Sequence, residues 1–132
     1  MAGSWAAMFR GSYVLSMSAA RELIRGLPSD PDYPWAGWYR LASMHVLMRF
    51  GRWEDILVEP NPMVDQTSVA LWHHARAIAC ANLGEFDAAR QEAGAFEDAA
   101  QRIPEDAALT APRDDLLAPD VVIRASCFCG AD

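Results

Sequence analysis

Three histidines are the side chains in this sequence best suited to chemistry, because imidazole can bind a metal, move a proton or hydrogen-bond a ligand near neutral pH. His73 and His74 are adjacent, so on a helix they point about 100 degrees apart and cannot hold one ion from the same face. His45 and His74 are the pair better suited to act together at one site. A zinc or copper site would need at least two further ligands, and the nearest candidates, Cys80 and Glu85, fall on another helix face or in a turn. The sequence therefore predicts no metal site.

Other residues with reactive side chains lack the spacing that enzymes need. Cys127 and Cys129 are separated by one residue, whereas redox and metal motifs usually have two between the thiols. The acidic pairs Glu105-Asp106 and Asp114-Asp115 lie in loop-forming sequence, where solvated charge is the expected role. The nucleophile, phosphate-loop and zinc-protease motifs are not found in the chain. We therefore predict no catalytic residue, no cofactor and no enzymatic activity.

Composition and charge narrow the possible partners and location. The chain has 132 residues, 52% of them apolar, and five tryptophans, which predicts one folded domain or a piece of one. A net charge of −7 disfavours binding to nucleic acid or an anionic membrane. Arg10 interrupts the apolar start, which argues against a signal peptide, and no convincing membrane span follows. Three cysteines form no disulfide framework, so we expect a reducing cytoplasm.

Apolar residues recur at helical spacing along most of the chain, and no segment alternates as a strand would. The sequence predicts an all-α protein of about five or six helices. Prolines punctuate the pattern: three lie in residues 27–34, and Pro60 and Pro62 end a short helix. Thr67 or Ser68 is the expected N-cap of the next helix. The expected helices cover residues 14–26, 35–50, 51–57, 69–82, 86–103 and 116–128.

One short sequence pattern occurs twice in the chain. Phe50-Gly51-Arg52-Trp53-Glu54-Asp55 aligns with Leu83-Gly84-Glu85-Phe86-Asp87-Ala88, and residues 9–13 carry a weaker echo. The glycine would end one helix in a left-handed conformation, and a repeat at this spacing indicates stacked helical hairpins. In the last hairpin, one helix face would carry the packing residues Phe86, Ala89, Ala93, Phe96, Ala100 and Ile103.

At these positions the chain resembles the tetratricopeptide repeat family. Leu83-Gly84-x-Phe86 matches the family's turn, Ala89 its small residue and Pro104 its terminating proline. Residues 36–104 are similar to an interior section of large, poorly characterised bacterial tetratricopeptide-repeat proteins. The resemblance implies stacked antiparallel hairpins in a right-handed α-solenoid, forming a single domain or fragment over 1–132. It would comprise a degenerate first hairpin at 1–26, repeat units at 35–59 and 69–104, and an unpaired terminal helix at 116–128.

The resemblance also implies a function, namely an interaction scaffold whose first helices line a concave groove for a protein or peptide. The groove positions would be Trp38, His45, Arg49, His74 and Asn82. Arg49 would bind a carboxylate, the histidines would hydrogen-bond, and Trp38 would give apolar area. The turn and packing positions would be Gly51, Trp53, Gly84, Phe86, Ala89 and Phe96.

Two alternatives remain open. The chain could be an accessory or regulatory helical domain, or a truncated fragment of a larger enzyme-associated protein, with a histidine site in the groove; that site would need His45 and His74 to converge in a closed pocket with an acid or a metal. Independently, both ends lack polar capping helices, which predicts exposed apolar surface and self-association through the terminal helices.

Overall fold

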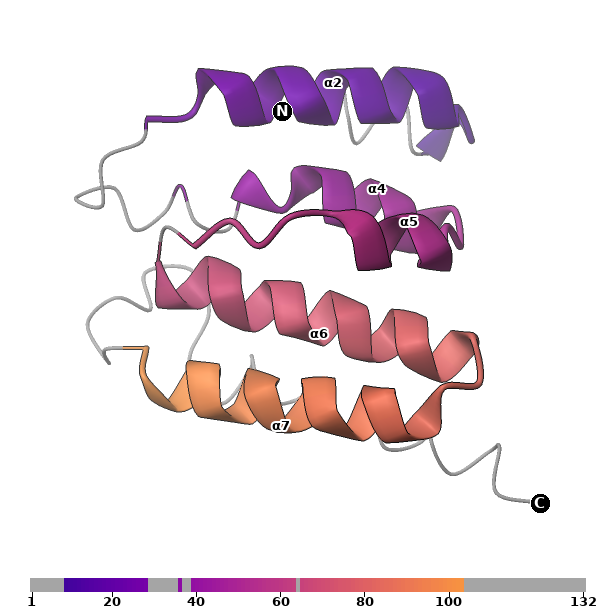
Figure 1. The fold of residues 1–132 in the computed structure, drawn as a ribbon. Helices are drawn as coiled ribbons and strands as arrows, with labels where there is room; N and C mark the ends of the chain where they lie inside the picture. Colours follow the sequence, from indigo (N-terminus) through magenta and orange to yellow (C-terminus); the bar gives the residue numbers. More distant parts are fainter. Residues whose placement is uncertain (1–8, 29–35, 37–38, 64, 104–132) are drawn as a thin grey trace.

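The computed structural model describes residues 9–28, 36, 39–63 and 65–103, and its regular elements within these ranges are all helices. They are α2 (Tyr13–Gly26), α4 (Ala42–Arg49), α5 (Trp53–Val58), α6 (Gln66–Asn82) and α7 (Phe86–Gln101). Figure 1 shows α2, the α4 and α5 pair, α6 and α7 stacked in chain order. The prediction of an all-α protein is confirmed for this part of the chain. The predicted helix at 116–128 lies outside the described residues.

The turns at Gly51 and Gly84 have the same hydrogen-bonded geometry. After α4, the Gly51 amide donates to Met48 O (3.2 Å) and the Arg52 amide to Leu47 O (2.9 Å). After α6, the Gly84 and Glu85 amides donate at the same offsets, over 3.2 and 2.9 Å. This pattern is a Schellman motif, which needs a left-handed residue at the helix end. Both glycines have positive φ, 65° and 80°, as the sequence predicted.

The helix that follows each turn also starts in the same way. Gly11 has a positive φ of 71°, and α2, α5 and α7 each begin two residues after a glycine of this kind, at an aromatic residue. The starting residues are Tyr13, Trp53 and Phe86. One residue before each start, a backbone carbonyl accepts the first helical hydrogen bond, over 2.9 to 3.2 Å. A glycine at positive φ with an aromatic helix start two residues later therefore occurs three times in the described residues, and the Schellman hydrogen bonds are seen at Gly51 and Gly84.

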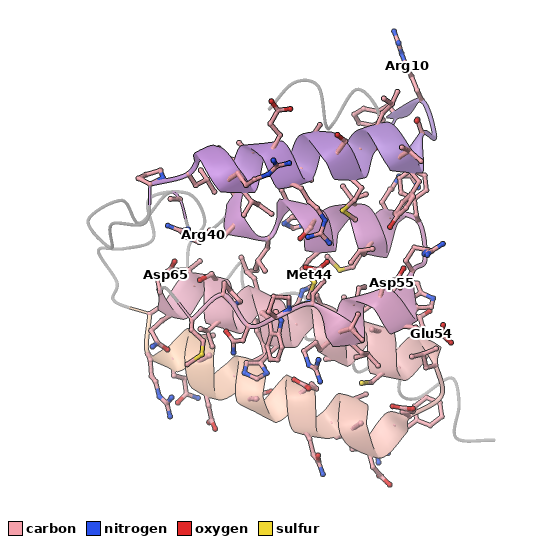
Figure 2. The ribbon with its side chains drawn as sticks, turned by 45° about the horizontal axis from the view of Figure 1, so that its top comes forward. Arg10, Arg40, Met44, Glu54, Asp55 and Asp65 are labelled. Carbon is pink, nitrogen blue, oxygen red and sulfur yellow. The ribbon has the colours of Figure 1, made fainter. Side chains whose placement is uncertain are left out.

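The main core lies between α4, α5, α6 and α7. Phe96 of α7 is only 1% exposed, and Met44 of α4 lies in the middle of the stack (Figure 2). Small buried residues, Ala75 and Ala79 among them, line α6 and let neighbouring helices approach closely. Of the predicted α7 face, Ala89, Phe96, Ala100 and Ile103 are buried, whereas Phe86 and Ala93 are half-buried. Trp53 packs at the edge of the core.

Helix α6 begins three residues earlier than its periodicity indicated. Its N-cap is Asp65, whose Oδ1 accepts a hydrogen bond from the Ser68 amide over 2.8 Å. The prediction of Thr67 or Ser68 as the cap is therefore wrong. Ser68 is instead buried inside the first turn, where its hydroxyl donates to Asp65 O. An aspartate in this position also matches the positive end of the helix dipole.

Helix α4 is shorter than the predicted helix at 35–50, because a turn at Leu41 separates it from the helical residues Tyr39 and Arg40. Among the helices described, none is long and apolar enough to cross a membrane.

Candidate functional site

The structure brings His45 of α4 close to His74 of α6. Burial is the main cause that lowers the pKa of His74 to about 4, and the charge of His45 lowers it further. Burial also lowers the pKa of His45. The His74 ring packs beside Phe96 of α7, with ring centroids 5.5 Å apart. Both imidazoles are therefore held neutral at pH 7 at the place where α4, α6 and α7 meet.

The surroundings of this pair show which chemistry it can perform. Burial lowers the pKa of both rings, and the charge of His45 lowers that of His74 further, so neither imidazole is a stronger base than an ordinary histidine. Within the described residues, no group of three or more histidine, cysteine, aspartate or glutamate side chains could hold a metal ion. Neutral imidazoles beside an aromatic ring are suited to hydrogen bonding and packing.

Arg49 and Asn82 occupy equivalent positions in the two hairpins, each two residues before the glycine of its turn. Arg49 is the last residue of α4 and Asn82 the last residue of α6, and both are exposed. The Asn82 Nδ2 atom donates to Ile78 O of its own helix over 2.8 Å. Arg49 has no carboxylate partner among the described residues. Of the five predicted groove residues, Trp38 lies outside the described part.

A second polar cluster, which the sequence did not indicate, surrounds Arg76 of α6. Its Nε donates to Glu92 Oε1 of α7 over 2.7 Å, and the other Glu92 oxygen lies 2.7 Å from His73 Nδ1. Its NH1 group donates to Leu57 O at the end of α5 over 2.8 Å. The guanidinium also lies over the Trp72 ring, 4.5 Å from its centroid. Arg76 thereby joins three helices, and its positive charge suits the carbonyl end of α5.

The segment that follows α5 is held by the same side of α6. The Trp72 indole donates to Glu59 O over 3.1 Å, and Arg21 of α2 donates to Glu59 Oε1 over 2.6 Å. Trp72 and Arg76 are four residues apart on one face of α6, which the sequence does show. Their partners are 13 to 19 residues away, so a sequence pattern could not identify them.

The surface is hollowed at the end of the molecule where the two Schellman turns lie. The hollow has a volume of about 430 Å³ and is lined by Gly51, Arg52, Trp53, Glu54, Asp55 and Leu83. Arg52 is bonded to Asp55 over 2.7 Å and lies over the Tyr13 ring. Glu54 lies at the edge of the molecule (Figure 2). The hollow is open and carries charge of both signs, so it favours no particular ligand.

Scans of the chain against protein-family models, curated proteins and solved structures found no match.

Proposed function

We propose that this chain is a tetratricopeptide-like module that binds an extended peptide or a segment of a partner protein along its α4 and α6 face. The observation that carries the proposal is the repetition of one turn geometry at Gly51 and Gly84, at the same place in successive hairpins. Equal turns at equivalent positions align the first helices of successive hairpins, and such stacks present extended surfaces for partners.

The α4 and α6 face offers groups suited to a peptide. Arg49 is an exposed cation available for a carboxylate, and Asn82 is an exposed amide one repeat further along. The Nε2 atoms of His45 and His74 are buried, so a peptide on this face would not reach them in this conformation. Charge-assisted bonds from arginine to carboxylates are stronger than neutral ones, so the partner segment should carry an acidic side chain or a free carboxyl terminus.

The histidine pair gives less support to an enzyme site. A general base is most effective when its pKa lies near the working pH, whereas burial lowers the pKa of both rings, that of His74 to about 4. The proposal is therefore a scaffold and not a catalyst.

Selection from a random peptide library, with the unchanged chain as the target, tests the proposal. Fluorescence anisotropy then gives the affinity of each selected peptide for the unchanged chain, Arg49→Gln and Asn82→Ala. The matched control is Arg90→Gln, because Arg90 is exposed on α7. We expect about a tenfold loss for Arg49→Gln, from the loss of one charge-assisted hydrogen bond, and no loss for the control. Equal affinity for all variants, or a failure to select any peptide, would contradict the proposal.

A further inference from the structure

An extended segment follows α5, in the place where a longer α5 would have continued. Helix α5 has six residues, and at Glu59 the backbone becomes extended, with φ −65° and ψ 132°. Prolines at 60 and 62 then exclude a helix. Figure 1 shows this segment running back along α6 toward the start of that helix. Two of its apolar side chains, Val58 and Met63, are each 80% exposed, so their packing does not hold the segment in place.

Polar contacts hold it instead, and they resemble those that bind an extended peptide. Two donors from one face of α6 reach carbonyl oxygens two residues apart: Arg76 bonds Leu57 O, and Trp72 bonds Glu59 O. From α2, Arg21 binds the Glu59 carboxylate. Main-chain hydrogen bonds combined with a charged contact to one side chain are the means by which peptide-binding surfaces recognise extended ligands.

Glu59 makes two of the three contacts, one through its carbonyl and one through its carboxylate. Its side chain is 14% exposed, whereas that of Arg21 is 54% exposed. Leu57, whose carbonyl accepts the hydrogen bond from Arg76, packs its side chain against the core. Loss of the Glu59 contacts would therefore free residues 59–63 while α5 stays in position.

We propose that Arg21, Trp72 and Arg76 form a binding surface for an acidic peptide that becomes extended at its glutamate, and that the last turn of α5 with the extended residues 59–63 occupies this surface in cis. An external segment that carries a glutamate in the place of Glu59 competes with the internal segment. The contacts of Glu59 therefore control access to this surface. The surface is distinct from the α4 and α6 face, because Trp72 and Arg76 lie on a different side of α6 from His74 and Asn82. Either proposal can fail without the other.

The experiment uses a fluorescein-labelled peptide with the sequence of residues 57–63, LVEPNPM, and a second peptide with glutamine in place of the glutamate. The proteins are the unchanged chain, Glu59→Gln, and the control Glu54→Gln, which removes the same charge from an exposed site. Hydrogen exchange of the Trp72 indole N–H, which donates to Glu59 O, reports release of the segment. Anisotropy reports binding of the peptide.

We expect the Trp72 indole N–H to exchange about tenfold faster in Glu59→Gln than in the unchanged chain, and the glutamate peptide to bind Glu59→Gln about tenfold more tightly. The glutamine peptide should bind about tenfold more weakly, and Glu54→Gln should behave as the unchanged chain does. Exchange as slow as in the unchanged chain overturns the proposal. Faster exchange without peptide binding overturns it as well, because the freed surface would then have no affinity for such a segment.

A second variant keeps the test decisive if Glu59→Gln does not fold. Arg21→Gln removes the same ion pair from its more exposed side, and it should speed exchange of the Trp72 indole N–H by a similar factor. It should not gain affinity for the glutamate peptide, because the arginine that would bind the carboxylate is gone. Its control is Arg25→Gln on the same helix, whose Nε bonds to Arg21 O. Equal exchange in Arg21→Gln and Arg25→Gln would contradict the role of the ion pair.

Discussion

Gly51 and Gly84 end two different helices with the same pair of hydrogen bonds and with left-handed backbone conformations of φ 65° and 80°. Each stands at the same place in its hairpin, two residues before the aromatic residue that starts the next helix. Because the residue at each turn sets the direction in which the next helix leaves, equal turns place α5 against α4 and α7 against α6 through equivalent connections. The stack depends on both glycines.

Gly84→Ala should lower the free energy of unfolding by about 1 kcal/mol or more, because a side chain at positive φ is strained. A Cβ at this position would meet no atom within 4 Å, so the cost comes from the backbone and not from a clash. Urea unfolding followed by circular dichroism measures it.

The control for this prediction is Gly94→Ala in the middle of α7. A Cβ there also meets nothing within 4 Å, and its φ is not in the left-handed region. Alanine favours a helix over glycine by about 0.5 to 1 kcal/mol, so this change should stabilise the chain. Equal effects of the two substitutions would mean that the turn conformation does not matter for stability.

Arg76→Met should destabilise the fold by about 2 kcal/mol or more, because it leaves the largely buried Glu92 carboxylate without its guanidinium partner. Arg90→Met should cost about 0.5 kcal/mol or less, since the Arg90 and Asp87 side chains are both well exposed. Urea unfolding of both variants gives the comparison.

A double-mutant cycle separates the Arg76 ion pair from other effects of the substitution. If Arg76 and Glu92 act together, Arg76→Met combined with Glu92→Gln should cost clearly less than the sum of the single changes. Additive costs would show that the Arg76 to Glu92 bond contributes little.

Stability should fall as the pH is lowered from about 6.5 to about 4 because of His74. In the unfolded chain its pKa is the ordinary 6.5, whereas burial and His45 lower it to about 4 in the folded chain. Between these pH values the unfolded state binds more protons, so acid favours unfolding. The contribution is about 2 to 3 kcal/mol, and it is complete near pH 4.

His74→Leu isolates this contribution from the carboxylates that titrate in the same range. As the pH falls from about 6.5 to about 4, the free energy of unfolding of the unchanged chain should decrease relative to that of His74→Leu, because the variant has no imidazole to protonate at this position. A constant difference between the two curves would show that His74 has an ordinary pKa in the folded chain. Titration of the His74 ring by NMR gives an independent value.

Exposed apolar side chains just before and at the start of α2 predict self-association. Phe9, Val14 and Leu15 are 82%, 74% and 62% exposed, which is unusual for large apolar side chains so near one another in the sequence. We expect light scattering after size-exclusion chromatography to give a mass above 14.5 kDa at high protein concentration, and Leu15→Glu to reduce it. A monodisperse monomer for the unchanged chain would refute the prediction.

The local features of this protein could be predicted from its sequence. Gly11, Gly51 and Gly84 indicated the turns, because glycine tolerates positive φ far better than other residues. The spacing from Ala89 to Ile103 indicated which side of α7 packs, because helical geometry relates residues three and four apart. The cap of α6 was misassigned, since Asp65, Thr67 and Ser68 are all good capping residues within one turn.

The contacts between helices were decided only by the tertiary structure. Arg76 and Glu92 are 16 residues apart on different helices, and Trp72 reaches Glu59 across a segment that the sequence showed only as a break. Such pairs depend on how each helix is rotated and offset against its neighbours, which many side chains set together when the core packs. The sequence alone therefore determined where helices end and which side packs, whereas packing decided that α6 holds the chain after α5 and that His74 is buried beside His45.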